Sequence, residues 1–173
     1  MTPNRRSQRA RMMELGRTMA PVKNGLDVGI AGDDPPGANR EFFQLAEGGL
    51  WTTADFDTGQ SPDRVLDITG TIPDDMKHQY DLVCCTQVLE HVWDLAQAAD
   101  GLWVLTGWGG HCIVDVPFLY PPHGTAVEQH DYWRIAPQGL ERLLKRAGFF
   151  HVETWADPAW LNTHAVARKG MLQ

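Results

Sequence analysis

Short apolar segments alternate with helix-like segments through most of the sequence. The strand-like segments lie at residues 25–30, 50–56, 64–68, 80–85 and 111–118. This alternation predicts a doubly wound, Rossmann-like α/β fold, in which helices cover both faces of a mostly parallel sheet. Two further strand-like segments, 149–156 and 162–169, are separated by only a few residues. That gap fits a hairpin but not a parallel crossover of about a dozen residues, so the sheet should end in an antiparallel C-terminal strand.

The clearest helical pattern lies at residues 137–147, where Pro137 suits the first turn and Gly148 the end. Other helical patterns are predicted at residues 4–20, around residues 42–46 and at residues 88–103, the last of them ended by Gly107, Gly109 and Gly110. Only the seven residues "TGQSPDR", 58–64, separate "TADFD" at the end of the second strand segment from Val65 of the third. We therefore expect a bare loop there in place of a helix, beside a weak third strand.

The length of 173 residues suits one domain, with an N-terminal helical extension at residues 1–24 and a Rossmann-like core at residues 25–173. The chain has 15 basic and 22 acidic residues, a formal charge of -7. This charge disfavours nucleic acid or an anionic membrane as a partner, and a small or neutral substrate fits better. The arginines of the extension are expected on a solvated helix face, with binding of an acidic partner as the alternative.

The three cysteines, Cys84, Cys85 and Cys112, lie inside apolar runs without the spacing of metal ligands. They predict buried thiols, and neither a disulfide framework nor a metal site. The first 16 residues are basic and contain no apolar run of the length that an export signal or a membrane span requires. A cytoplasmic protein is therefore expected.

Polar side chains follow the predicted strands at the edge where open α/β sheets bind ligands. They are Asp27 with Gly29, Asp55 with Asp57, Asp67, and Thr86 with Gln87. Each acid alone is equally well explained as a turn residue or a helix cap. Together they favour a ligand rich in hydroxyl and amino donors, such as an adenosine.

The loop after the first predicted strand narrows the choice of adenosine cofactor. A dinucleotide fold requires G-x-G-x-x-G, whereas Gly29, Ala31 and Asp34 occupy these positions here. Asp33 and Asp34 would place negative charge beside a pyrophosphate, which disfavours a nicotinamide-dependent oxidoreductase. A phosphate-free cofactor that carries an ammonium and a sulfonium meets no such repulsion.

Several motifs resemble those of class I S-adenosylmethionine-dependent methyltransferases, especially the methyltransferase type 11 pattern. They are "LDVG", "TADFD", "LDIT", "YDLVCCTQVLEHV", "GGHCIVDVPFLYPPHG" and "HDYWRIAPQGLERLLKRAGF", in this order over residues 25–169. The resemblance implies S-adenosylmethionine as the cofactor and methyl transfer to a small molecule or a glycan, with oxygen as the expected acceptor atom. The alternative is a degenerate, non-catalytic binding or partner subunit, because Ala31 and Asp33 replace two glycines of the family's pattern.

The resemblance also implies roles for the residues at the first two strand ends. Asp27 and the backbone from Gly29 to Ala31 would hold the methionine end of the cofactor. Asp55, or alternatively Asp57, would accept hydrogen bonds from the ribose hydroxyls.

For the adenine and the methyl group, the resemblance implies residues at later strand ends. Phe56 would lie near the adenine, Asp67 would accept a hydrogen bond from its amino group, and Ile68 would pack on the ring. Thr86 and Gln87 would line the pocket opposite the transferring methyl.

A general base for a hydroxyl acceptor is expected on the long loop after the fifth predicted strand. His130 with Asp131, or His123, could remove the proton, because a neighbouring carboxylate keeps an imidazole basic near neutral pH. The alternative is that the aromatic residues of this loop only anchor it to the sheet. A structural role is expected for Glu90 and His91 on the helix that follows the fourth strand.

Overall fold

The structure is a computed structural model that describes residues 3–30, 37–122 and 130–171, with side chains from residue 10 onward. Its strands are β1 (Val22–Val28), β2 (Leu45–Asp55), β3 (Arg64–Val65), β4 (Tyr80–Thr86), β5 (Thr106–Pro117), β6 (His151–Ala156) and β7 (Asn162–Arg168). Its α-helices are α1 (Pro3–Thr18), α2 (Leu95–Leu105) and α3 (Pro137–Ala147). Short 3-10 helices lie between them, namely η1 (Ala38–Phe42), η2 (Thr58–Gln60), η3 (Asp74–Met76) and η4 (Leu89–His91).

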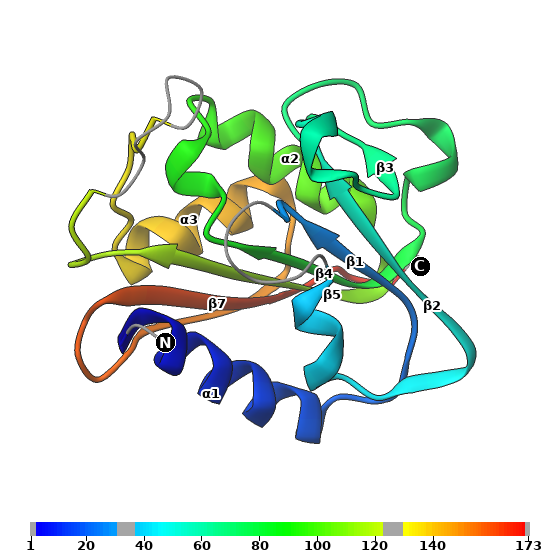
Figure 1. Ribbon diagram of the computed structural model, residues 1–173, viewed down its shortest axis with the longest axis horizontal. Coiled ribbons are helices and arrows are strands. Elements are labelled where there is room, and N and C mark those ends of the chain that lie inside the picture. The colour runs from blue at the N-terminus through cyan, green and yellow to red at the C-terminus, as the bar shows by residue number, and fades with distance from the viewer. Residues whose placement is uncertain (1–2, 31–36, 123–129, 172–173) are drawn as a thin grey trace.

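The strands form one seven-stranded sheet in the order β3-β2-β1-β4-β5-β7-β6 (Figure 1). The pairs from β3 to β5 are parallel, whereas β7 runs antiparallel to both β5 and β6. Helices α2 and α3 pack on one face of this sheet, and α1 with η1 packs on the other. The predicted doubly wound sheet with an antiparallel C-terminal strand is therefore confirmed.

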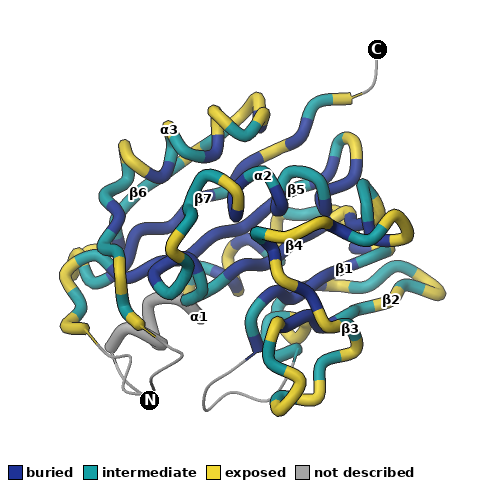
Figure 2. The backbone as a smooth tube through the Cα atoms, turned by 90° about the horizontal axis from the view of Figure 1, so that it is seen from above, coloured by how far each residue is buried: buried dark blue, intermediate teal, exposed yellow. Residues whose placement is uncertain are grey.

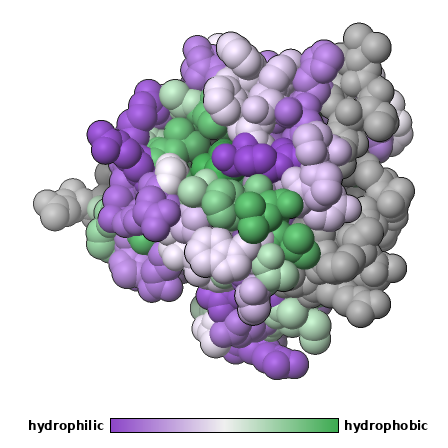
Figure 3. All heavy atoms as spheres, turned by 90° about the vertical axis from the view of Figure 1, so that its left-hand side faces the viewer, coloured by the Kyte–Doolittle hydropathy of each residue, from purple (hydrophilic) through white to green (hydrophobic). Residues whose placement is uncertain are grey.

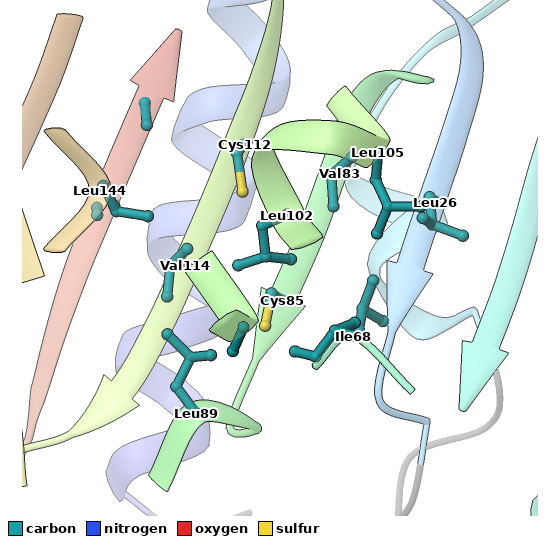
Figure 4. Packing of buried hydrophobic residues seen from close by; sticks show 14 of the residues in the cluster. Leu26, Ile68, Val83, Cys85, Leu89, Leu102, Leu105, Cys112, Val114 and Leu144 are labelled. Carbon is teal, nitrogen blue, oxygen red and sulfur yellow. The ribbon is translucent and has the colours of Figure 1, made fainter. Parts of the chain in front are cut away.

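Buried residues are concentrated in the strands, and the outer surfaces of α3 and of the connecting loops are exposed (Figure 2). The larger apolar cluster lies between the sheet and the helices α2 and α3, where Leu102, Leu105 and Leu144 point toward Val83 and Val114 of the strands (Figure 4). A smaller cluster lies under α1. All three cysteines are buried and free, as predicted, and burial raises the pKa of each thiol.

Helix α3 has both of its predicted ends. Pro137 is in the first turn, and Gly148 ends the helix with a left-handed backbone, φ 111°. Leu140 and Leu144 are fully buried on one face, as the spacing of leucines predicts. The predicted weak third strand is also present, since β3 has only two residues, but the connection before it is not a bare loop, because it contains the short 3-10 helix η2.

The helix predicted at residues 88–103 is wrong in its first part. The chain forms η4 and then leaves helical geometry until Asp94, whose side chain accepts a hydrogen bond from the backbone N–H of Gln97 at 2.9 Å. Asp94 is therefore the N-cap of α2, and the helix begins at the next residue, Leu95. The glycines expected to end the helix lie within β5, where Gly110 leaves room for the backbone oxygen of Tyr80.

The helix predicted around residues 42–46 is also wrong. The 3-10 helix η1 ends at Phe42, and Leu45 already pairs with Val22 of β1 as the first residue of β2. Pairing with a distant strand has overridden the local helical pattern. Within the described residues, no helix is long and apolar enough to cross a membrane.

Candidate functional site

A cavity lies at the edge of the sheet where the parallel strands β1, β2 and β4 end. Its lining residues are Val28, Gly29, Asp55, Phe56, Asp57, Leu66, Asp67, Ile68, Gln87, Val88, His91 and Val92. Strands β4 and β5 point toward the left of Figure 1, and Figure 3 shows apolar side chains gathered near the middle of that face. The cavity therefore occupies the position at which open α/β sheets bind ligands.

Gly29 forms the sharp turn that ends β1 at the cavity wall. Its backbone is left-handed, with φ 77°, and its N–H donates to the oxygen of Ala54 at 2.8 Å. A Cβ atom at this position would lie 2.2 Å from Cγ2 of Val88. Glycine is required here both by the left-handed backbone and by the close approach of Val88, because any Cβ atom would overlap the Val88 side chain.

Asp55 joins the ends of β1 and β2. It is 4% exposed, and its two carboxylate oxygens accept hydrogen bonds from the backbone N–H groups of Ile30 at 2.8 Å and Asp57 at 2.9 Å. Each carboxylate oxygen has further lone pairs, so Asp55 can also accept hydrogen bonds from ligand hydroxyls. Asp57 lines the cavity too, but its carboxylate caps η2 by accepting from Gly59 N–H at 2.8 Å.

The wall beyond β2 is apolar with one acid. Leu66 and Ile68 are each 5% exposed, and Phe56 is 61% exposed beside them. Asp67 stands between the two aliphatic residues, where its Oδ1 accepts from the N–H and the hydroxyl of Thr69 at 2.8 and 2.7 Å. Such a wall suits a flat ring with a polar edge, and Asp67 also serves as a turn residue.

Asp27 lies beneath the cavity and is not among its lining residues. Its carboxylate is 3% exposed and accepts hydrogen bonds from Asn39 Nδ2 at 2.6 Å and Trp51 Nε1 at 3.1 Å. Burial raises the pKa of Asp27 to about 6, although these hydrogen bonds oppose the shift. The same Asn39 Nδ2 donates to Thr86 Oγ1 at 3.3 Å, and Thr86 is likewise outside the lining. Ala31 falls outside the described residues.

His91 lines the cavity, although its sequence position predicted only a structural role. Its Nδ1 lies 2.9 Å from the backbone oxygen of His130. A carbonyl oxygen can only accept, so Nδ1 carries the proton and Nε2 is the basic nitrogen of the neutral ring. The signal that could have found His91 is its place just after a strand that ends at the ligand-binding edge.

The neighbouring Glu90 is fully buried, and burial raises its pKa to about 8, with smaller contributions from the charges of Asp115 and Asp131. Its Oε1 lies 3.8 Å from Nε2 of His91. Glu90 is therefore mostly protonated at neutral pH. Protonated Glu90 places less negative charge beside His91 than an ionised Glu90 would.

The predicted base candidates His130 and Asp131 lie on the segment whose backbone contacts His91 of the cavity wall. Both carboxylate oxygens of Asp131 accept hydrogen bonds from the guanidinium of Arg134, at 2.5 and 2.6 Å. The ring of His130 lies 5.6 Å from that of Tyr132, and neither His130 nor Asp131 is among the lining residues. Trp133 anchors the segment, since its Nε1 donates to the oxygen of Val92 at 2.9 Å. His123 falls outside the described residues.

Comparison of the sequence with protein-family models gave no match, and comparison with curated proteins gave none either. The structure is similar to a protein of Bordetella parapertussis described as a possible exported protein, with a TM-score of 0.72, 15% identity, and 96% of this chain and 68% of that chain covered. It is also similar to the 1,6-didemethyltoxoflavin-N1-methyltransferase of Burkholderia thailandensis with bound S-adenosylhomocysteine. There the TM-score is 0.63 and the identity 17%, with coverage of 96% and 77%.

A third similar structure is phosphoethanolamine N-methyltransferase 2 of Haemonchus contortus in complex with S-adenosyl-L-methionine. Its TM-score is 0.69 at 11% identity, and the alignment covers 95% of this chain but only 52% of that one. The chain therefore has the fold of the class I S-adenosylmethionine-dependent methyltransferases. The likeness shows the fold alone, and the methyl acceptors named for these enzymes do not carry over to this chain.

Proposed function

We propose that the protein binds S-adenosylmethionine in the cavity and transfers its methyl group to a small-molecule or glycan acceptor. The observation that carries this proposal is the Gly29 turn, which lines the cavity at the end of β1, beside the buried carboxylate of Asp55 at the end of β2. In methyltransferase folds a ligand is expected at this edge. The apolar wall and the acids suit an adenosine that carries no phosphate.

The lining residues fit the parts of the cofactor. Asp55 would accept hydrogen bonds from the ribose hydroxyls, while Ile68 and Phe56 would pack against the adenine. Asp67 would accept from the adenine amino group, and the Gly29 backbone would hold the methionine end. When bound, the cofactor supplies an electrophilic methyl group on a sulfonium. The protein's own part is then to align the acceptor with that methyl and to exclude water.

The predicted roles of Asp27 and Thr86 enter the proposal in a modified form, and the role of the Ala31 backbone stays as predicted. Asp27 precedes Gly29 by two residues and accepts a hydrogen bond from Asn39, and with Asn39 it would support the turn instead of touching the cofactor. Thr86 would act through the same asparagine.

We further propose His91 as the base for a hydroxyl acceptor. It lines the cavity, and the backbone oxygen of His130 fixes its tautomer so that Nε2 can accept a proton. His130, whose backbone oxygen contacts His91, remains a candidate, and so does His123. Asp131, held by Arg134, would position this loop instead of assisting a histidine directly.

Calorimetric titration with S-adenosylmethionine and S-adenosylhomocysteine tests the cofactor. We expect micromolar binding by the wild type and a loss of affinity of at least about tenfold in Asp55→Asn, which removes a charge-assisted acceptor. Asp57→Asn makes the same charge change at the alternative ribose acceptor, which caps η2, and it should bind almost as well. A loss of affinity in Asp57→Asn alone would assign the ribose to Asp57 instead. A wild-type protein that binds neither ligand would contradict the proposal.

A non-catalytic member of the fold is the second candidate. The short connection between β2 and β3 favours it, because residues 56–63 contain only the 3-10 helix η2 and no α-helix. Such a protein would bind S-adenosylhomocysteine weakly or not at all, and its binding would be insensitive to Asp55→Asn.

A further inference from the structure

Four side chains form a row across the α1 face of the sheet, next to the cavity. The row begins with Gln87 at the end of β4 and continues through Asp115 of β5 and His164 of β7 to Trp155 of β6. The register explains the row, because Thr86 pairs with Asp115, Asp115 with His164, and His164 with Trp155. We call these four residues the polar row.

Contacts with the Asp115 carboxylate, a hydrogen bond from Gln87 and a close approach of His164, fix the orientation of both neighbours. The carboxylate is 2% exposed; its Oδ1 accepts from Gln87 Nε2, and its Oδ2 lies 2.6 Å from Nδ1 of His164. An ionised carboxylate has no proton to donate. The nitrogen of the Gln87 amide must therefore face Asp115, and Nδ1 of His164 must carry a proton.

Helix α1 covers the other end of the row. The guanidinium of Arg11 lies 4.0 Å from the ring centroid of Trp155, and that ring stacks on His164 at 5.5 Å with an interplanar angle of 17°. Met12 and Leu15 of the same helix are 2% and 8% exposed. The helix thus shields the His164–Asp115 pair from bulk solvent, and a shielded pair holds its geometry more firmly than an exposed one.

Gln87 connects the row to the cavity. Its backbone has a left-handed φ of 57°, and its N–H donates to the backbone oxygen of Asp115 at 2.8 Å. Its side chain also lies 3.4 Å from Oδ1 of Asn162 through the same Nε2. Gln87 is therefore held by Asp115 through both backbone and side chain, while it forms part of the cavity wall.

We propose that Asp115 and His164 are positioning residues, which orient the Gln87 amide so that its carbonyl oxygen is presented to the cavity. This oxygen accepts a hydrogen bond from a donor on the bound ligand, such as an ammonium or a hydroxyl group. The second part rests on the proposed function, since it takes a donor-bearing cofactor or acceptor to be the occupant. Without the carboxylate, the amide could turn over and present its NH₂ group, which repels the same donors.

The side-chain amide of Gln87 in the ligand-free protein tests the orientation. In ¹⁵N-resolved NMR spectra, its resonance is identified by its loss in Gln87→Ala. We expect slow exchange of its protons with water in the wild type and in His164→Asn, which keeps a donor at the Nδ1 position. Asp115→Asn and His164→Leu should exchange faster, and His164→Gln replaces the leucine variant if that variant does not fold. Unchanged exchange in Asp115→Asn and in the His164 variant that lacks the donor would overturn the proposal.

A double-mutant cycle on S-adenosylhomocysteine affinity tests the consequence for the site. His164→Leu and Gln87→Ala should each weaken binding by about tenfold, near the worth of one hydrogen bond. The double variant should bind no more weakly than Gln87→Ala alone, because His164 acts through Gln87. Additive losses would mean that His164 supports only the fold. If the wild type does not bind this ligand, the proposed function fails, whereas the exchange of the Gln87 amide still decides the orientation.

Discussion

Replacing Gly29 with alanine should destabilise the protein through two separate effects. The left-handed backbone, φ 77°, costs about 1–2 kcal/mol for a residue with a Cβ atom. The new methyl would also lie 2.2 Å from Cγ2 of Val88, and relief of such overpacking costs about 1–3 kcal/mol. Together these effects predict a loss of about 2–5 kcal/mol in the free energy of unfolding.

Urea unfolding of a set of variants separates the two effects. Gly48 has a similar φ of 69°, but a methyl added there would have no atom within 4 Å, so Gly48→Ala should show the backbone cost alone, about 1–2 kcal/mol. Adding Val88→Ala to Gly29→Ala should recover the contact cost, as a favourable coupling of about 1 kcal/mol or more. Equal losses in the two glycine variants, together with no coupling to Val88, would refute the close approach of Val88 to the turn.

Three further predictions concern buried polar groups. The pKa of Glu90 is raised from 4.5 to about 8, so the folded state binds a proton more tightly than the unfolded chain. The stability of the wild type should therefore fall relative to that of Glu90→Gln as the pH rises between these two values. Urea midpoints of the two proteins that run parallel over pH 4–9 would contradict this prediction. Lys169 is fully buried and donates to the backbone oxygens of Trp103 and Thr106. Lys169→Met should therefore lower the free energy of unfolding by about 2–3 kcal/mol. Arg168→Met, at the exposed neighbouring position, is the control and should change it very little. Finally, Arg11 Nε is buried without a hydrogen-bond acceptor among the described residues, and Arg11 lines a cavity of about 10 Å³ together with Asp115 and His164. This volume is close to the roughly 10–15 Å³ that one water needs, so a crystal structure should show a water in the cavity. A dry cavity would contradict this prediction.

Local signals in the sequence were sufficient for much of the fold. The leucine spacing of α3, with Pro137 and Gly148 at its ends, depends on neighbours along the chain, so it could be read directly. The short gap before β7 likewise left a hairpin as the only connection. The start of α2 was misplaced because the apolar spacing continues through residues 88–92, although Asp94 supplies the N-cap.

The site was harder to predict than the fold, because a strand end does not reveal which face its side chains occupy. Gly29 directly follows β1, Asp55 is the last residue of β2, and both line the cavity. Asp27 belongs to the same motif, yet it turns to the other side, where Asn39 and Trp51 come from distant segments. No pattern in the sequence could bring these donors together.

The polar row was missed for the same reason. His164 lies in the last strand and Asp115 in the fifth, and the pair exists only because β7 inserts between β5 and β6. Arg134 could also have been read as the partner of Asp131 from its spacing of three residues, but the adjacent His130 drew the interpretation toward a histidine–carboxylate pair.

A crystal structure of the protein with S-adenosylhomocysteine tests the proposed site most directly. We predict ligand density against Gly29, with the ribose hydroxyls within about 3 Å of the Asp55 carboxylate and the adenine beside Ile68. The Gln87 amide oxygen should face the ligand. Density elsewhere on the molecule, or an adenosine whose ribose lies away from Asp55, would contradict the assignment of this cavity as a cofactor site.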